Sequence, residues 1–138
     1  MKIILPVLIL GLFASDYLYA NEENQLVGEW KGNGEKTVEA RIKSGSLKDK
    51  SVASKLIPLY SDETYIFTNT TVKISSASKN STSTAIPYET IRKNDSSVTI
   101  SFQVKNGKYS QLTFHFSMDE NCIYVEREKY NDYFCKKL

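Results

Sequence analysis

Apolar and polar residues alternate most regularly between Ser97 and Ser117, in two runs on either side of Asn106-Gly107. Such alternation predicts two strands that each bury one face. The apolar positions are Val98, Ile100, Phe102 and Val104 in the first run, and Leu112, Phe114 and Phe116 in the second. Pairing Val104 with Lys108 keeps them on a common face. That register predicts a hairpin closed by a type I turn, with Gly107 left-handed in a G1 bulge.

The rest of the chain also reads as short strands. Val38, Ala40 and Ile42 alternate with polar residues, which predicts a strand over 37–43. Val52 to Tyr60 is less regular, and Pro58 confines its second half to an edge or a bulge. Further strands are expected in four segments, which are 65–74, 85–92, 122–126 and 133–137. We expect no helix within residues 21–138.

Turn-rich segments separate these strands at roughly even intervals. The longest is the polar stretch 75–84, SSASKNSTST, which predicts a mobile surface loop. Eight or nine short strands with short connections favour an all-β fold, an antiparallel up-and-down meander that forms a closed or partly closed barrel.

The N-terminus has the pattern of a secretory signal peptide. Lys2 precedes an apolar run from Ile3 to Phe13, and Leu18-Tyr19-Ala20 is a plausible cleavage site. As a helix the run reaches about 16 Å, well short of the roughly 30 Å hydrocarbon core. The sequence therefore predicts a signal peptide over 1–20 and one domain over 21–138, secreted or periplasmic, with no stable membrane span after cleavage.

Cys122 and Cys135 are the two cysteines of the chain, and an even count in an exported protein favours a disulfide. Pairing them directly sets Ile123 against Phe134 in a C-terminal hairpin. Closing a loop of this size stabilises the fold by about 3 kcal/mol. A reactive thiol or metal pair would need partners such as histidine, which the sequence does not supply nearby.

Charge gives little indication of a partner. The net charge is +2, which indicates no nucleic-acid partner. Between Lys31 and Lys55 there are seven Lys/Arg against three Asp/Glu, which we interpret as a solvated strand face and loop rather than a site for an anionic ligand.

Few residues have the pattern of catalytic or metal-binding groups. His115 is the sole histidine and falls on the polar face of its predicted strand. A general base needs a nucleophile and an orienting partner, and no local spacing suggests them. A carboxylate pair remains open in principle, although the acidic residues mostly alternate with basic ones. We therefore expect no enzyme, no catalytic residue, no metal site and no cofactor.

Leu26-Val27-Gly28-Glu29-Trp30 resembles the first-strand G-x-W of lipocalin-like (calycin-type) proteins, which are small up-and-down barrels. The resemblance implies that Gly28 lets the backbone bend and that Trp30 plugs one end of the barrel. It also implies a basic side chain from a late strand over Trp30, for which the candidates are Arg127, Lys136 and Lys137.

Two functions follow as expectations. The first is a lipocalin-like barrel that holds a small apolar or amphipathic ligand, with Trp30, Phe102, Phe114 and Phe116 as ligand-binding residues. The second is a protein-interaction module that contacts a secreted or envelope protein, for example as an inhibitor of a lysozyme-type hydrolase. Its contact surface would be the 75–84 loop with Tyr124, Tyr130 and Tyr133, because tyrosine offers a large contact area with a polar tip.

Overall fold

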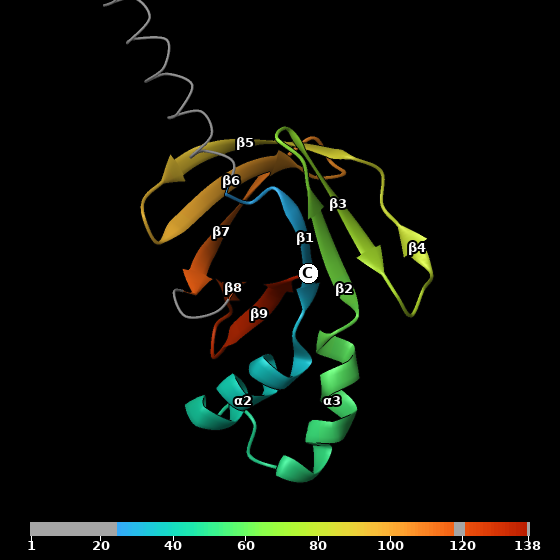
Figure 1. Ribbon diagram of the computed structural model, residues 1–138, viewed down its shortest axis with the longest axis vertical. Helices are drawn as coiled ribbons and strands as arrows, with labels where there is room; N and C mark the ends of the chain where they lie inside the picture. The colour runs from blue at the N-terminus through green and yellow to red at the C-terminus, as the bar shows by residue number, and fades with distance from the viewer. Residues whose placement is uncertain (1–24, 118–120, 138) are drawn as a thin grey trace, which may run out of the picture.

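The chain forms an antiparallel β-barrel with two helices inserted after its first strand, as seen in a computed structural model that describes residues 25–117 and 121–137 (Figure 1). The helices are α2 (Gly34–Ser44), the 3₁₀ helix η1 (Lys50–Val52) and α3 (Ala53–Tyr60). The strands are β1 (Gly28–Gly32), β2 (Glu63–Phe67), β3 (Thr71–Ser76), β4 (Ser81–Thr82), β5 (Ile86–Lys93), β6 (Ser97–Gln103), β7 (Tyr109–Ser117), β8 (Cys122–Glu126) and β9 (Asn131–Lys136).

Each barrel strand pairs with its neighbours along the chain. In the described residues the order around the barrel is β1, β2, β3, β5, β6, β7, β8 and β9, and β9 pairs back to β1. The short strand β4 lies outside this closed set and pairs with β3 alone. The predicted antiparallel meander is thus confirmed, and closure leaves few sheet edges unpaired.

The β6–β7 hairpin has the predicted register. Val98 pairs with Phe114 and Ile100 with Leu112, so the apolar side chains face the interior together. The N–H of Val104 donates to the carbonyl of Lys108 at 2.8 Å, and Gly107 is left-handed with φ 73°. A residue with a Cβ tolerates that conformation poorly, which explains the glycine in the bulge.

The β8–β9 hairpin also has the predicted register. Cys122 lies opposite Cys135, and the two form a disulfide. Ile123 lies opposite Phe134, and both side chains are buried in the barrel. The disulfide therefore ties two strands that already share a ladder, on the outer face of the sheet.

Residues 37–43 form part of helix α2, so the predicted strand there is wrong, as is the expectation of no helix. Asn33 caps the helix with its side-chain oxygen, which accepts from the N–H of Lys36 at 3.0 Å. Gly45 ends it in a left-handed conformation. Val38 and Ile42 are four residues apart, a spacing that fits one face of a helix as well as one face of a strand.

Residues 53–60 form α3, so the predicted edge strand over 52–60 is also wrong. Pro58 lies inside this helix, where it removes one hydrogen-bond donor. Packing compensates, because α3 lies against α2 and both lie beneath β1, β2 and β9 (Figure 1). We call residues 34–60, comprising α2, η1 and α3, the helical cap.

Gly34 lets the start of α2 approach the end of α3 closely. A Cβ on Gly34 would collide with the carbonyl of Ile57 and the hydroxyl of Ser61. In its place the N–H of Gly34 donates to Oγ of Ser61 at 3.0 Å. Glycine at position 34 thus permits a close approach between α3 and the start of α2.

The 75–84 segment is more ordered than the mobile surface loop that its composition predicts. Its residues 81–82 form β4, and Asp62 holds the turn before it. Asp62 accepts hydrogen bonds from the hydroxyl of Ser76 at 2.7 Å and from the N–H of Ser78 at 2.6 Å. These bonds lower the pKa of Asp62, since they favour the charged carboxylate.

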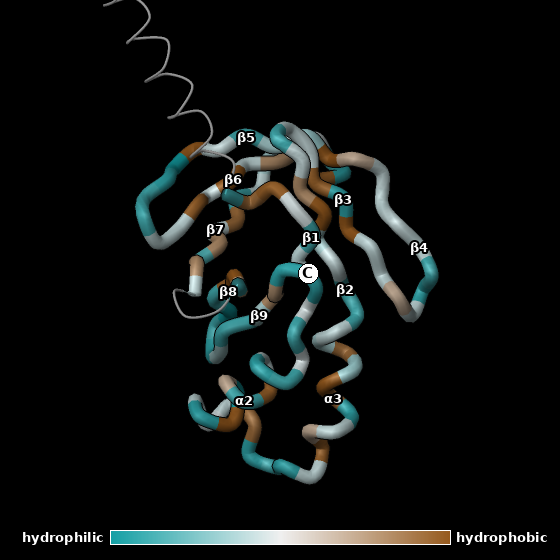
Figure 2. Tube along the Cα trace, viewed as in Figure 1, coloured by the Kyte–Doolittle hydropathy of each residue, from teal (hydrophilic) through white to brown (hydrophobic). Residues whose placement is uncertain are grey.

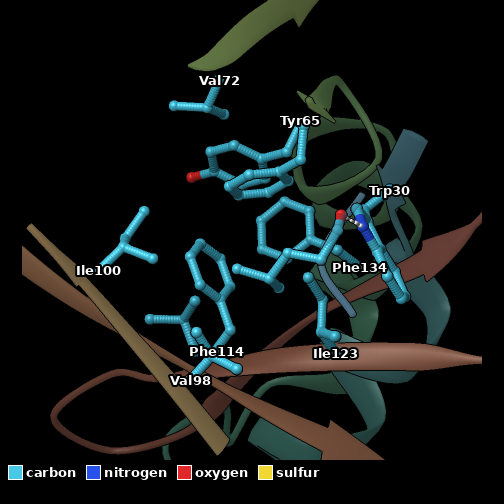
Figure 3. Packing of buried hydrophobic residues seen from close by; sticks show 11 residues of the cluster. Trp30, Tyr65, Val72, Val98, Ile100, Phe114, Ile123 and Phe134 are labelled. Atoms are coloured by element: carbon cyan, nitrogen blue, oxygen red, sulfur yellow. Dashed lines mark hydrogen bonds between the residues drawn. The ribbon is translucent and has the colours of Figure 1, made fainter. Parts of the chain in front are cut away.

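Aromatic rings from several strands fill the middle of the barrel (Figure 3). The ring of Tyr65 lies 4.8 Å from that of Phe134 and 5.9 Å from that of Phe114, centroid to centroid. Phe67 lies 5.4 Å from Phe114, which is 0% exposed. The edge-to-face geometry of these pairs is typical of a packed core.

Candidate functional site

An open hollow lies where the helical cap meets the barrel. It has a volume of about 410 Å³, in the range of roughly 300–1,000 Å³ found for small-molecule sites. We call it the mouth hollow, and it is lined by Leu56, Leu59, Tyr60, Glu63, Arg127, Tyr130, Asp132 and Phe134. Three structures contribute to it, namely α3, the start of β2 and the β8–β9 hairpin.

Strand alternation sets the barrel side of the mouth hollow. Along β9, Asp132 and Phe134 are buried while Tyr133 between them is partly exposed. The turn before β9 is closed by the N–H of Arg127, which donates to the carbonyl of Tyr130 at 2.8 Å. This turn brings Arg127 back over Asp132, five residues along the chain.

Arg127 and Asp132 form the polar centre of the mouth hollow. Nε and Nη2 of Arg127 donate to Oδ2 of Asp132 at 3.4 and 3.1 Å. On its other oxygen Asp132 accepts from the hydroxyl of Thr37 at 3.4 Å, and that hydroxyl accepts from the N–H of Tyr133 at 2.9 Å. Asp132 is 8% exposed, so its charge is held by hydrogen bonds rather than by water.

The phenol of Tyr65 lies next to this ion pair. Burial, followed by the nearby carboxylate of Glu63, raises the pKa of Tyr65 to about 12, while Arg127 acts in the opposite direction. The neutral phenol is therefore the stable form at physiological pH. It places a hydroxyl beside the ion pair without adding charge.

A second cluster fixes the outer wall of the mouth hollow. Nη1 of Arg41, on α2, donates to the hydroxyl of Tyr60 at 2.7 Å. The same guanidinium lies over the ring of Tyr130, 5.0 Å from its centroid, a cation–π contact. Burial, then the hydrogen bond with Tyr60, raises the pKa of Tyr130. Arg41 thereby links both helices to the β8–β9 turn.

The mouth hollow has two chemically different sides. Leu56 and Leu59 make the α3 side apolar, and Leu59 is 68% exposed. The β8–β9 side has the neutralised Arg127–Asp132 pair and the hydroxyl of Tyr130. Such an arrangement fits a small molecule with an apolar part and a polar, uncharged part.

Trp30 is buried in the core with a basic side chain over its ring, an arrangement compatible with the lipocalin-like resemblance. It is 5% exposed, and its Nε1 donates to the carbonyl of Leu26 at 2.7 Å. Of the three basic candidates, Lys136 has its Nζ 5.6 Å from the Trp30 ring centroid. Gly28 is needed there, because its φ is +135° and an added Cβ would lie 3.2 Å from Cε of Lys136.

The ligand-binding residues predicted from sequence all lie in or against the core. Phe114 is at its centre, while Phe102 and Phe116 are partly buried and pack against it. None of these four residues, Trp30 included, lines the mouth hollow. That they bind a ligand stays a prediction.

The three predicted contact tyrosines fall into two groups. Tyr124 and Tyr133 are opposite one another on β8 and β9, with ring centroids 5.3 Å apart. Tyr130 packs instead on Tyr60, 5.9 Å away. Their role in binding a partner stays a prediction. His115 stacks on Tyr124, and its Nε2 is 3.4 Å from Oε1 of Glu126.

Sequence reasoning missed the α3 side of the hollow, because residues 52–60 were interpreted as a strand. The signal was present, since Val52, Leu56 and Tyr60 recur at the four-residue spacing of one helix face. Within 25–117 and 121–137 no group of three or more His, Cys, Asp or Glu side chains is placed to hold a metal ion. The helices of these residues are all too short or too polar to cross a membrane.

Comparison of the chain with protein-family models, with curated proteins and with solved structures gives no match. The eight-stranded closed barrel is compatible with the lipocalin-like resemblance. Function is therefore inferred from the fold and from the geometry of the mouth hollow.

Proposed function

We propose that this chain is a non-catalytic, exported binding protein that holds a small amphipathic ligand in the mouth hollow. The observation that carries the proposal is the hollow itself, an opening of about 410 Å³ with an apolar helix on one side and a neutralised ion pair on the other. The ligand's apolar part would lie along Leu56 and Leu59, and its polar part would face Arg127 and Tyr130.

The packed core favours this position over the middle of the barrel. A ligand in the middle would have to displace the rings of Tyr65, Phe67 and Phe114, which already contact one another. Displacing well-packed aromatic rings costs several kcal/mol, whereas the hollow is open already.

The disulfide supports a location outside the cytoplasm. A bond between Cys122 and Cys135 persists in oxidising surroundings such as the periplasm or the extracellular space. The predicted signal peptide agrees with export, although residues 1–20 lie outside the described part of the chain.

A fluorescence titration tests the proposal. The purified protein is titrated with anilinonaphthalene sulfonate, a small amphipathic dye, and the bound dye is then displaced with a monoacylglycerol, which has an apolar chain and an uncharged polar head. We expect saturable binding of the dye and competition by the monoacylglycerol. Leu56→Gln should weaken binding by about ten- to a hundredfold, since contact with a buried leucine is worth about 1.5–3 kcal/mol.

The matched control is Val104→Gln, at an exposed position on the β6–β7 hairpin outside the hollow. It should bind the dye as the unchanged protein does, and far-ultraviolet circular dichroism should show both variants folded. Absence of saturable binding, or equal affinities of folded Leu56→Gln and Val104→Gln, would refute the mouth hollow as the site.

A further inference from the structure

The positive charge of this chain is concentrated on the helical cap. Residues 34–60 have six Lys/Arg and three Asp/Glu, a net charge of +3, whereas the whole chain has a net charge of +2. The charge excess thus belongs to one end of the molecule rather than to its surface at large (Figure 1).

Three lysines of the cap, Lys48, Lys50 and Lys55, are exposed and make no ion pair within the described residues. The cap's other basic groups are engaged, as Lys43 is with Glu39 at 3.2 Å. The loop between α2 and α3 that holds Lys48 and Lys50 is hydrophilic and forms the tip of the cap (Figure 2).

Asp49 offsets one of these three lysines. Its carboxylate accepts from the N–H and the hydroxyl of Ser51, at 3.0 and 2.6 Å, and so caps η1. These bonds lower the pKa of Asp49, so it remains charged and occupied by Ser51. The segment from Lys48 to Leu59 therefore has a net charge of +2.

Helix α3, which follows Lys48 and Lys50 in the chain, adds an exposed apolar residue. Its exposed positions are two adjacent pairs, Ser54-Lys55 and Pro58-Leu59, which are four residues apart and so form one stripe along the helix. Lys55 and Leu59 are four residues apart, so they are neighbours on that stripe. Leu59 is 68% exposed, so its side chain is accessible to an apolar partner.

We propose that the exposed stripe of α3, with the lysines that precede it, docks the protein on an anionic lipid surface. Charge complementarity selects that occupant, because exposed lysines attract anionic headgroups while an exposed leucine next to Lys55 on α3 can enter the boundary with the acyl chains. An acidic protein would be attracted by the lysines as well, but the isolated, exposed leucine favours a fluid apolar boundary over a shaped pocket.

This docking is independent of the mouth hollow as a ligand site, because it depends on the charges and the leucine alone. Leu59 also lines that hollow, so a docked protein would hold the mouth near the lipid surface. The two proposals can fail separately, since one concerns binding of vesicles and the other binding of a soluble dye.

Co-sedimentation with vesicles tests the docking. One set of vesicles contains equal parts of phosphatidylglycerol and phosphatidylcholine, and the other contains phosphatidylcholine alone. We expect binding to the first set, weakened by added salt, and little binding to the second. Equal binding to both sets, or binding to neither, would overturn the proposal. All variants share one N-terminus, so any lipid affinity of residues 1–20 is common to them.

The lysine variant is Lys48→Gln/Lys50→Gln/Lys55→Gln, which should bind the anionic vesicles on the order of a hundredfold more weakly, since each lysine near such a surface contributes about 1 kcal/mol. Its matched control is Lys73→Gln/Lys105→Gln/Lys108→Gln, which removes the same charge from exposed positions on the β3 strand and the β6–β7 turn. The control should retain most of the affinity. An equal loss in both triple variants would show a general effect of net charge and overturn the assignment to α3.

The apolar contribution is tested by Leu59→Ser, with Val104→Ser as its control at another exposed position. Leu59→Ser should weaken binding to the anionic vesicles several-fold and leave its salt dependence unchanged, because the lysines remain. No difference between the two serine variants would exclude insertion of Leu59. Circular dichroism establishes that each variant is folded before the comparison.

Discussion

Arg127 and Asp132 form an ion pair at the mouth of the barrel, in which Nε and Nη2 of the arginine both donate to Oδ2 of the aspartate, Nη2 at 3.1 Å. The pair does more than neutralise two charges. Asp132 also reaches the hydroxyl of Thr37 on α2, so one carboxylate joins the β8–β9 turn to the helical cap. The shape of the mouth hollow depends on this junction.

Asp132→Ala should therefore destabilise the fold. The substitution leaves the hydroxyl of Thr37 and the guanidinium of Arg127 without their acceptor, at a cost of about 2 kcal/mol in the free energy of unfolding. Urea denaturation followed by circular dichroism measures the change. Asp95→Ala, at an exposed turn position, is the control and should change stability by less than about 0.5 kcal/mol. Similar values for both variants would contradict a structural role for the ion pair.

Loss of the disulfide should cost a comparable or larger amount. The double variant Cys122→Ala/Cys135→Ala removes a link that closes a loop with a sequence separation of 13, worth about 3 kcal/mol. Urea denaturation with and without a reductant measures the loss. The reductant should destabilise the unchanged protein and have no effect on the double variant. If the reductant did not lower the free energy of unfolding of the unchanged protein, the disulfide would contribute little to stability.

Gly28→Ala should strain the contact between Trp30 and Lys136. The left-handed φ of Gly28 and the nearby Cε of Lys136 together should cost about 1–3 kcal/mol. Trp30 is the sole tryptophan, so its emission reports the same region. Gly45→Ala is the matched control, because Gly45 is also left-handed but has open space around it. Only Gly28→Ala should shift the tryptophan emission, and a shift in both variants would contradict a local effect.

Alkaline pH should weaken the fold through Tyr65. The pKa of its phenol is about 12 in the folded chain, whereas a fully solvated tyrosine has a pKa of 10.0, so the unfolded chain loses the proton first. The contribution of neutral Tyr65 to the free energy of unfolding is fully present below pH 10. It is lost as the pH rises toward 12, and the total loss is about 2–3 kcal/mol.

Urea denaturation across that pH range provides the test. Tyr65→Phe should flatten the decline in stability, whereas Tyr109→Phe, at a position 73% exposed, should leave it unchanged. A decline of the same steepness in Tyr65→Phe would assign the alkaline loss to other groups.

The hairpins could be predicted from sequence because their signals are local. Alternation over Val98–Val104 and Leu112–Phe116 admits one register with a common apolar face, and Gly107 supplies the left-handed residue that this register needs. The disulfide followed in the same way, because Cys122 and Cys135 bracket strands with matching patterns.

The helical cap was missed because short patterns are degenerate. Val38, Ala40 and Ile42 suit a strand, yet Asn33 and Gly45 bracket the same residues as the caps of a helix. In α3, Pro58 was interpreted as the mark of an edge strand or a bulge, whereas the segment is a helix that packing against α2 stabilises. The mouth hollow could not be predicted from the sequence for the same reason, since its lining combines Leu56 on α3 with Arg127 on a turn that is distant in the sequence.

Backbone amide chemical shifts recorded during a titration with the monoacylglycerol test the central claim most directly. If the ligand binds in the mouth hollow, the largest shifts will fall on residues such as Leu56, Tyr130 and Asp132, and they will saturate together. Shifts centred instead on Phe102, Phe114 and Phe116 in the barrel, or on Tyr124 and Tyr133 on the outer face, would contradict the account.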